Sequence, residues 1–288
     1  MIDLHLHTRA SDGAHEPAEL VRRIWLAGIR TFSVTDHDTV AGLAAARDAA
    51  RRYGLECIAG IEMTSIAEGV DVHVLEYFID PDSPALASVL AAQRADRVRR
   101  LRDLAARLDA VGLPIDVERI IAATPEGRSV GRPQIADALV RAGHVSSMRQ
   151  AFDLWIGEGR PAFVPRAAPA AAEVCALIHQ AGGLAAIAHP GCLGRDDLAE
   201  RVAMSGADAL EVHHPDHDEP STTRYRDMAV RLGLLVTGGS DYHRDDGRHA
   251  GALGRVTLPQ ADFDRLLTQH EERNTRHGPR SEARGPRP

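Results

Sequence analysis

The first fifty-three residues alternate short apolar runs with helical patterns: IDLHL (residues 2–6), PAELVRRIWLA (17–27), TFSVT (31–35) and VAGLAAARDAARRY (40–53). Short apolar runs of this kind are typical of buried strands, whereas the segments between them have the apolar spacing of amphipathic helices. A βαβα order is typical of parallel sheets and barrels. The N-terminal region therefore predicts an α/β fold built on parallel strands.

The same alternation extends to both sides of a long helical region. We predict strands at 56–61 and 70–79, the second being a strand or hairpin that follows the polar turn 67–69. Further strands at 184–188, 209–212 and 234–238 each follow a predicted helix. These segments give seven strands, which together with the helices predict a β/α barrel.

The helical region interrupts the barrel pattern. Residues 85–110 form one long charged helix in this prediction, and helical patterns continue to residue 155 with no strand between them. The segment 157–165, rich in Gly and Pro, is typical of a linker back to the barrel. We therefore predict a barrel at 1–84 and 166–268, a helical insert at 85–165 that caps the substrate, and a disordered tail at 272–288.

Composition narrows the class of protein. The chain has 288 residues and a formal net charge of −7, which argues against a general nucleic-acid coat. Three widely spaced cysteines, Cys57, Cys175 and Cys192, predict neither a disulfide framework nor a thiolate zinc site. The sequence shows no secretion signal and no run of eighteen apolar residues, so we expect a cytoplasmic protein without a membrane span.

Histidine and carboxylate residues gather where the predicted strands end. Parallel β/α barrels carry their catalytic groups at the C-terminal ends of the strands. In the first strand, His5 and His7 alternate with Leu4 and Leu6, so both imidazoles lie on one face. Imidazole and carboxylate donors without thiolate suit Zn, Mn or Fe. The candidate ligands are His5, His7, Asp12, His37, Glu62, His73, His189, Asp241 and His243.

These residues lie in motifs that resemble the PHP (polymerase and histidinol phosphatase) family of metal-dependent phosphoesterases, and in particular its nucleoside-monophosphate and 3′,5′-nucleotide bisphosphate phosphatase branch. Seven motifs occur in the order that the family has them. They are Asp3-x-His5-x-His7, Ser11-Asp12-Gly13, Thr35-Asp36-His37, Gly60-Ile-Glu62, His73, Ala188-His189-Pro190 and Ser240-Asp241-x-His243. The resemblance implies a distorted seven-stranded (β/α)7 barrel.

The resemblance also implies a centre of two to three divalent ions. The first ion would be held by His5, His7, Glu62 and Asp241, and the second by Asp12, His37 and His243. Glu62 would bridge to a third ion that His73 and His189 also bind. Asp12 stands where many family members have His, which resembles the nucleotide-phosphatase branch and leaves the identity of the second metal open.

Catalytic roles follow from this expectation. Divalent ions lower the pKa of bound water from about 15.7 to about 7 and neutralise phosphoryl oxygens. Besides Glu62, we predict catalytic roles for Asp36 and His214. Asp36 and Asp38 flank His37, where they could orient it or protonate the leaving group, although Asp38 fits equally well as a helix N-cap. His214 or His213, where the sixth strand ends, could contact substrate or donate a proton, and a fourth metal site there is the less favoured alternative.

Substrate recognition requires cations beyond the metals. Arg132 and Arg160 lie in Gly-Arg-Pro segments that resemble substrate-binding segments of the phosphatase branch, and Arg128 is equally well explained as a surface residue. The arginines of the long charged helix, between 94 and 107, alternate with aspartates and predict a solvated face. We interpret five other histidines as surface or loop residues: His15, His144, His179, His249 and His270.

The leading hypothesis is hydrolysis of a small phosphomonoester, AMP or a nucleoside 3′,5′-bisphosphate, with release of phosphate. The expected partner is a small phosphorylated metabolite or nucleotide, and neither a long nucleic acid nor a membrane. Alternatives are a phosphodiesterase for cyclic phosphates, a 5′–3′ exoribonuclease for short RNA, and a histidinol-phosphatase-like enzyme. A regulatory metal-binding module is disfavoured because all nine candidate ligands are present. The sequence leaves the native metal and the oligomeric state open.

Overall fold

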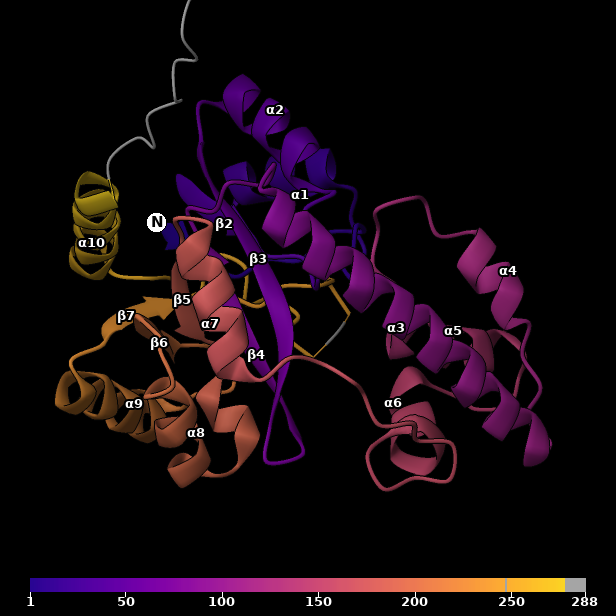
Figure 1. Ribbon diagram of the computed structural model, residues 1–288. Coiled ribbons are helices and arrows are strands. Elements are labelled where there is room, and N and C mark those ends of the chain that lie inside the picture. The colour runs from indigo at the N-terminus through magenta and orange to yellow at the C-terminus, as the bar shows by residue number, and fades with distance from the viewer. Residues whose placement is uncertain (247, 278–288) are drawn as a thin grey trace, which may run out of the picture.

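The computed structural model describes residues 1–246 and 248–277, apart from the side chains of 276 and 277. Its centre is a seven-stranded sheet whose strands follow one another in chain order, which confirms the predicted α/β fold and nearly closed barrel (Figure 1). The strands are β1 Ile2–Asp3, β2 Thr31–Val34, β3 Glu56–Ala67, β4 Val70–Tyr77, β5 Leu184–Ile187, β6 Ala209–His213 and β7 Leu235–Gly238.

The barrel is distorted by one long hairpin. Strands β1 to β3 pair in parallel, and so do β5 to β7, but β4 is antiparallel to both of its neighbours. The β3 strand continues beyond its predicted end at residue 61, because a tight turn at Glu68 and Gly69, with φ values of 50° and 80°, returns the chain alongside it. In this register His73 lies opposite Thr64, close to Glu62.

The two ends of the sheet meet along a short seam. Leu4 N donates to Gly238 O at 3.2 Å, and His7 N donates to Tyr242 O at 3.1 Å. The Leu6 and Tyr242 backbones form an isolated parallel bridge. The residues that follow β1 therefore lie directly beside those that follow β7.

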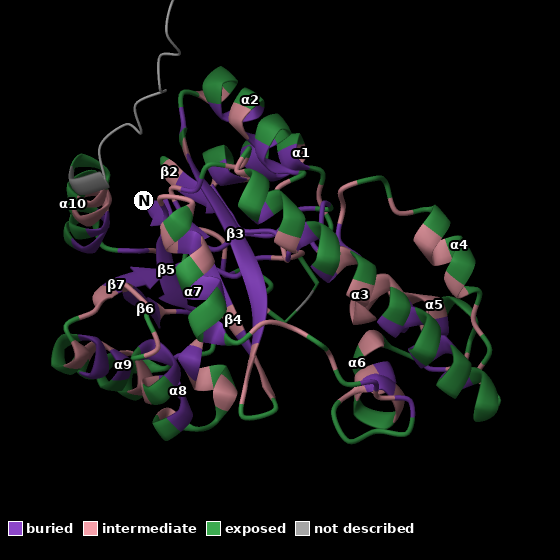
Figure 2. Ribbon diagram, viewed as in Figure 1, coloured by how far each residue is buried: buried purple, intermediate pink, exposed green. Residues whose placement is uncertain are grey.

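Helices cover the outside of the barrel with one apolar face each. In α1, for example, Leu20, Val21 and Ile24 are fully buried, and each such side chain stabilises the fold by about 1.5–3 kcal/mol relative to an exposed one. Figure 2 shows the strands buried and the outer helix faces exposed. The covering helices are α1 Pro17–Leu26, α2 Leu43–Tyr53, α7 Ala171–Gln180, α8 Asp196–Ala203, α9 Glu219–Leu232 and α10 Gln260–His277.

A separate group of helices packs to one side of the barrel (Figure 1). It consists of α3 Pro84–Ala110, α4 Val117–Ala122, α5 Arg132–Arg141, α6 Met148–Ala151 and the π-helical turn Phe152–Ile156. These helices bury an apolar cluster of their own, which includes Leu104, Leu108, Ile135, Leu139 and Ile156 and is distinct from the barrel core. The first turns of α3 belong to the barrel, because Leu86 and Leu90 pack in its core, so the division at residues 85 and 165 stays a prediction.

The C-terminal helix corrects one sequence prediction. Helix α10 runs to His277, so residues 272–277 are helical and do not begin a disordered tail. Phe263 and Leu266 bury its apolar face, and Arg273 anchors its last turns by donating to Gly183 O at 2.7 Å. The rest of the predicted tail, 278–288, lies outside the described residues. None of the helices in the described ranges combines the length and apolar character needed to cross a bilayer.

Candidate metal centre

The structure brings all nine candidate ligands together at one end of the barrel. They form four overlapping groups in which the potential ligand atoms lie within 4.8 Å of one another. The ligand residues lie on β3 and β4 or in the segments that follow β1, β2, β5 and β7. The groups are His7, Asp12, His37 and His243; His5, His7 and Asp241; His5, Glu62 and His189; and His37, Glu62 and His73.

Four residues surround one point. The Nε2 atoms of His5 and His7 are 3.1 Å apart, and each lies 3.1–3.3 Å from Glu62 Oε2 and from Asp241 Oδ1. Ligands about 2.0–2.1 Å from a tetrahedral ion are separated from one another by about 3.3 Å. These four atoms therefore fit the first coordination sphere implied by the family resemblance.

Glu62 links this group to two others. Its Oε1 lies 2.8 Å from His73 Nδ1 and 3.1 Å from His189 Nε2, while its Oε2 also lies 3.1 Å from His37 Nδ1. Although burial opposes ionisation, the surrounding imidazoles hold the pKa of Glu62 well below its usual range. Glu62 is thus an ionised carboxylate whose two oxygens can each bind a different cation.

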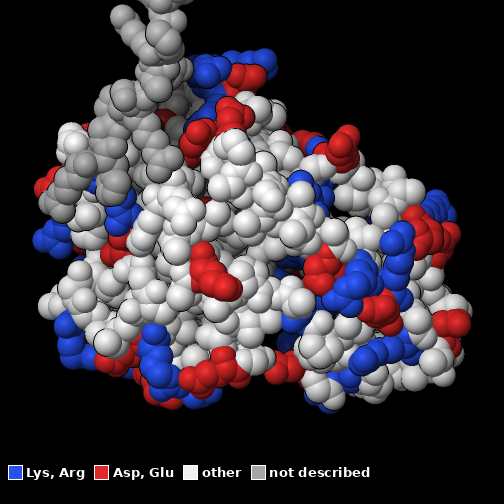
Figure 3. Space-filling view, viewed as in Figure 1, with Lys and Arg blue, Asp and Glu red and all other residues white. Residues whose placement is uncertain are grey.

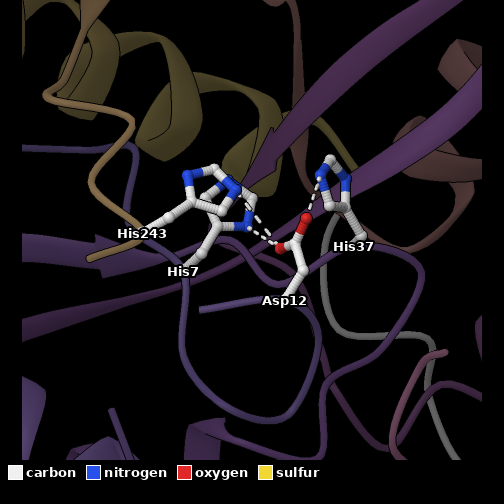
Figure 4. A group of neighbouring side chains, drawn as sticks. All are labelled: His7, Asp12, His37 and His243. Carbon is white, nitrogen blue, oxygen red and sulfur yellow. Dashed lines mark ion pairs between the residues drawn. The ribbon is translucent and has the colours of Figure 1, made fainter. Parts of the chain in front are cut away.

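A further group is shown in Figure 4 and centres on Asp12. Asp12 Oδ1 lies 3.2 Å from His243 Nε2 and 3.7 Å from His7 Nδ1, and Asp12 Oδ2 lies 3.7 Å from His37 Nε2. His7 therefore faces the first group with Nε2 and this second group with Nδ1. The Nδ1 atom is buried and has no hydrogen-bond partner among the described residues.

The donor set suits divalent cations better than protons alone. Buried polar atoms are normally hydrogen-bonded, yet His37 Nδ1 and His189 Nδ1 also lack hydrogen-bond partners in the described part of the chain. Burial opposes a charge on His7, but its hydrogen bonds to Asp241 and Glu62 raise its pKa to about 10. Positive charge is therefore favoured between these carboxylates, which is what a bound metal ion supplies.

Strained backbone marks the same region. His189, Asp241 and Asp38 have φ values of 28°, 44° and 51°, which are uncommon for residues other than glycine. Such conformations persist only where the surrounding structure enforces them, and they cluster at functional sites. Two of these three residues are candidate ligands, so the strain here serves to aim their side chains.

Sequence reasoning assigned no role to Glu211, a carboxylate that supports the ligands. Glu211 is fully buried on β6, accepts a hydrogen bond from His5 Nδ1 at 2.8 Å and accepts another from His189 N at 2.6 Å. Burial opposes its ionisation, but the imidazoles, His5 first, lower its pKa below the ordinary value. The feature of the sequence that could have identified Glu211 is the presence of a carboxylate in the middle of a predicted buried strand.

The aspartates next to the ligands hold loops rather than imidazoles. Asp36, predicted as catalytic, accepts from Thr8 N, Thr8 Oγ1 and Ser11 Oγ at 2.6–2.7 Å, so both of its oxygens are engaged by the loop after β1. Asp3 accepts from Ser240 N at 2.9 Å, across the seam between β1 and β7. Both side chains are buried and fix the backbone from which ligands project.

His214 and His249 hold the candidate ligand Asp241. Asp216 N donates to His214 Nδ1 at 3.1 Å, which leaves the ring proton on Nε2, 3.3 Å from Asp241 Oδ2. We predicted that His214 could contact substrate. Its side chain is fully buried in this structure. His249, interpreted from sequence as a surface or loop residue, lies with its Nδ1 3.1 Å from Asp241 Oδ2. His249 does lie in a loop, and its contact with Asp241 was not predicted from the sequence.

Three arginines gather beside the centre, and only Arg132 was predicted there. Arg97, which we expected on a solvated face of α3, ion-pairs with Asp38 and lines a small pocket together with Asp12 and His37. Arg132 and Arg166 lie 3.8 and 3.7 Å from Asp71 Oδ2. The Nε and Nη1 atoms of Arg166 are buried without hydrogen-bond partners among the described residues. Burial, and then the charge of Arg97, lowers the pKa of Arg166 to about 9.

Arg160 lies apart from these arginines. It is exposed, and none of the ion pairs found in residues 1–246 and 248–277 involves it. Its backbone N–H donates to Gly157 O at 3.1 Å in the turn after the π-helical segment. Arg160 O in turn accepts from Phe163 N at 2.9 Å, and the Phe163 ring lies 5.8 Å from the Arg132 guanidinium, so the predicted pairing of the two arginines at substrate stays a prediction.

A larger cleft opens on the other side of Asp12. It has a volume of about 790 Å³ and separates the loop after β1 from α4 and α5. Arg128, left undecided by the sequence, lies in its wall and pairs with Glu16 at 2.7 Å. Arg244 donates to Asp12 O at 3.5 Å. Five arginines line this cleft: Arg9, Arg119, Arg128, Arg141 and Arg244.

Comparison with known proteins gives a consistent result. The PHP domain matches residues 3–156. A 3′,5′-nucleoside bisphosphate phosphatase from Chromobacterium violaceum is 34% identical over 258 residues, which cover 87% of this chain and 90% of the relative. A 5′-3′ exoribonuclease from Haemophilus influenzae is 37% identical over 249 residues, 84% of this chain and 89% of the relative.

The fold is also found among solved structures. A protein from Bifidobacterium adolescentis, assigned as a metal-dependent phosphoesterase, superimposes with a TM-score of 0.84 at 34% sequence identity. The alignment covers 93% of this chain and 96% of that one. The similarity therefore includes the helical group as well as the barrel.

Proposed function

This chain belongs to the PHP domain family of metal-dependent phosphoesterases, and from that premise we propose that it removes a phosphate group from a nucleoside 3′,5′-bisphosphate. The observation that carries the proposal is a group of three arginines on carboxylates next to candidate ligands. Arg97 ion-pairs with Asp38, which follows His37, and Arg132 and Arg166 lie near Asp71, two residues before His73. A second phosphate on the substrate would explain why buried cations without full partners lie there. The reaction would release inorganic phosphate and a 5′-monophosphate.

The nine residues would hold two to three divalent ions, of Mn, Zn or Fe. Bound ions would lower the pKa of water to about 7 and neutralise the phosphoryl oxygens of the substrate. Glu62, with one oxygen toward His5 and His7 and the other toward His73 and His189, is placed to be shared between ions. The identity and number of the ions are part of this proposal.

The arginines would bind the phosphate that is not hydrolysed. Asp38 fixes Arg97 on one side, whereas Asp71, half-buried, is the carboxylate nearest to both Arg132 and Arg166. Burial lowers the pKa of Arg132 as well as that of Arg166, because little water or counter-charge compensates these guanidinium groups. An anion placed among them would be stabilised by charge-assisted hydrogen bonds.

Asp36 and His214 would act as positioning residues in this mechanism. Asp36 holds the loop that carries Asp12, and His214 donates to Asp241, so each acts on the reaction through a ligand. This replaces the direct proton-donor roles that we considered from the sequence, since both side chains are buried and already hydrogen-bonded.

The experiment follows hydrolysis by the protein purified without chelator and supplied with Mn²⁺. Inorganic phosphate reports the monoesters, and chromatography of the products reports pApA and the cyclic phosphate, whose cleavage releases no inorganic phosphate. The panel is AMP, adenosine 3′,5′-bisphosphate, a cyclic ribose phosphate, pApA and histidinol phosphate. We expect the bisphosphate to have the highest kcat/KM. Because charge-assisted hydrogen bonds contribute about 1.5–3 kcal/mol, Arg166→Met should raise KM for the bisphosphate by about ten- to hundredfold and affect AMP less.

Arg160→Met is the matched control, because its side chain is exposed and should change neither substrate's KM appreciably. Equal losses for AMP and the bisphosphate in Arg166→Met would contradict the role of this arginine in binding a second phosphate. No hydrolysis of any of the five compounds would contradict the proposed substrate class.

A second candidate function is cleavage of a phosphodiester in a short 5′-phosphorylated RNA. The cleft beside Asp12 supports it, because about 790 Å³ lined by five arginines is room for a further nucleotide on the leaving-group side. Arg244 would then contact the next phosphate. A kcat/KM for pApA above that for the bisphosphate, reduced in Arg244→Met, would favour this function over the first.

A further inference from the structure

A second group of ligand-type side chains lies at the rim of the metal centre. It consists of Cys192, His214 and Asp216, whose potential ligand atoms lie within 4.8 Å of one another. Cys192 is in the 3₁₀ turn Pro190–Leu193 that follows β5, and the other two are in the loop that follows β6. None of the three is among the nine candidate ligands of the metal centre.

The distances within this group fit a tetrahedral ion. Cys192 Sγ lies 3.5 Å and His214 Nδ1 lies 3.8 Å from Asp216 Oδ2. A zinc ion binds sulfur at about 2.3 Å and nitrogen or oxygen at about 2.0–2.1 Å, which separates sulfur from oxygen by about 3.5 Å and nitrogen from oxygen by about 3.3 Å. The thiol is therefore in place, and the imidazole needs to move by a few tenths of an ångström.

The hydrogen bonds of His214 select the tautomer in which Nδ1 carries the lone pair that a metal ion needs. Its Nδ1 accepts the backbone N–H of Asp216 at 3.1 Å, so this atom carries a lone pair, and its Nε2 carries the proton near Asp241 Oδ2. An ion bound at Nδ1 would replace the backbone N–H. The other ring nitrogen would keep its carboxylate, an arrangement typical of histidine ligands to zinc.

The chemistry of the group differs from that of the metal centre. A thiolate selects soft or borderline ions such as Zn²⁺ and Cd²⁺, whereas the nine candidate ligands contain no sulfur. Cys192 is exposed, so ions reach it from solvent. Asp216 Oδ2 is also bound by His249 at 3.0 Å and by Arg248 at 2.9 Å, and an ion at this oxygen would replace the Arg248 side chain, which is 70% exposed.

We propose that Cys192, His214 and Asp216 form a separate site for a thiophilic divalent cation such as Zn²⁺. His214 connects this site to Asp241, so an ion bound at the rim changes the charge felt by a ligand of the metal centre. The site depends on neither the identity of the substrate nor the reaction proposed above.

The test is a titration of the full chain, saturated with Mn²⁺, with Cd²⁺. Ultraviolet absorption by the cadmium–thiolate bond reports the ion at Cys192, even if Cd²⁺ also enters the histidine centre. We expect one saturating band in the wild type, none in Cys192→Ser, and weaker binding in Asp216→Asn. A band that is absent from the wild type, or that persists in Cys192→Ser, would overturn the proposal.

The other two cysteines provide the matched control. Burial raises the pKa of Cys57 to about 11 and that of Cys175 to about 12, so both remain thiols at neutral pH. Cys57→Ser should therefore keep the cadmium band unchanged. A band lost in Cys57→Ser would place the ion elsewhere and contradict the assignment.

The link through His214 has its own readout. With any phosphoester that the enzyme hydrolyses, excess Zn²⁺ should lower the rate of the wild type more strongly than that of Cys192→Ser. Equal inhibition of the two proteins would overturn the link to Asp241. Because the cadmium band needs no substrate, its result stands apart from any failure of the proposed function.

Discussion

Glu211 illustrates how the residues behind the ligands determine whether the centre can form. Its two oxygens hold the His5 imidazole and the His189 backbone at the same time. Supporting partners of metal ligands orient the ligands, and their loss typically costs about ten- to hundredfold in metal affinity or activity. Glu211 is therefore a positioning residue, although it touches neither substrate nor metal in our proposal.

We expect Glu211→Gln to weaken metal binding by about ten- to hundredfold, because an amide is a poorer acceptor for His5 Nδ1. Metal affinity measured by titration calorimetry checks this. Glu200→Gln, which removes an ion pair with Arg231 on the surface, is the control and should bind metal as the wild type does. An affinity in Glu211→Gln equal to that of the control would show that Glu211 does not position His5.

Glu76 is a buried carboxyl group that the proposed reaction does not use. Both of its oxygens lack hydrogen-bond partners among the described residues. Burial raises the pKa of Glu76 well above its ordinary value of 4.5, and the charge of Asp38 raises this pKa further. The folded state therefore keeps a proton that the unfolded chain releases above that pH.

The sign of the pH dependence follows from this difference in bound protons. As pH rises above 4.5, unfolding releases the Glu76 proton, so stability falls by up to about 1.4 kcal/mol per pH unit until the folded-state pKa is reached. Glu76→Gln cannot ionise. We expect the free energy of unfolding of Glu76→Gln, measured with urea, to gain on that of the wild type as pH rises. This gain should be small near pH 4 and grow toward pH 8. A difference that does not vary with pH would refute the prediction.

At the scale of the elements, the seam between β1 and β7 carries much of the site. Gly239 packs so closely on β1 that an added Cβ would lie 2.6 Å from His5 Cβ and 2.7 Å from Asp3 Oδ1. His5 and Asp241 both project from this seam. The seam can therefore neither widen nor slip without displacing ligands.

Gly239→Ala should lower the free energy of unfolding by about 1–3 kcal/mol, because overpacking forces the two segments apart. It should also weaken metal binding. Gly233→Ala is the control: its φ of 69° makes alanine strained by about 1–2 kcal/mol, but nothing lies within 4 Å of the added Cβ. Denaturant unfolding and metal titration separate the two effects. Unchanged metal affinity in Gly239→Ala would show that the seam does not position His5.

The elements also show what the sequence could predict. The strands and the candidate ligands were predictable because apolar periodicity locates strand ends, and motif order identifies the residues there. Arg97 was not, because α3 lacks a strongly one-sided apolar pattern and only tertiary contacts decide which of its arginines face the barrel. Arg166 was not, because it lies in the irregular segment before α7, where no periodic pattern shows which side chains are buried. The burial of His214 and the exposure of Arg160 likewise depend on packing between loops distant in sequence.

For the whole molecule, metal binding and stability are coupled. A ligand that binds only the folded state at one hundred times its Kd adds about 2.7 kcal/mol of stability. Since about 1 kcal/mol shifts the Tm of a domain of comparable size by roughly 2–4 °C, Mn²⁺ or Zn²⁺ should raise the Tm of chelator-treated protein by several degrees. Thermal unfolding followed by circular dichroism checks this.

Glu62→Gln is the variant that tests this coupling, because it removes the carboxylate common to two of the four groups of ligands. It should remain folded, bind less metal, lose turnover and show little rise in Tm with added ions. A rise equal to that of the wild type would mean that the ions stabilise the protein from elsewhere.

Charge is distributed unevenly over the molecule. The chain has a formal net charge of −7, yet arginines lie on two sides of the metal centre. Figure 3 shows acidic and basic side chains interspersed over the visible face, with basic groups prominent on the helical side. All 34 residues counted as Lys or Arg are arginine, since the sequence contains no lysine, so each of these side chains offers a planar, permanently charged fork to an anion.

The separate apolar core of the helical group has an evolutionary consequence. Because most of those helices share an apolar cluster of their own, mutations can reshape their surface while the barrel keeps its candidate ligands in place. Relatives at similar levels of identity are named for a bisphosphate phosphatase and for an exoribonuclease. A scaffold divided in this way allows new specificities to arise by drift in one half, with the chemistry inherited intact in the other.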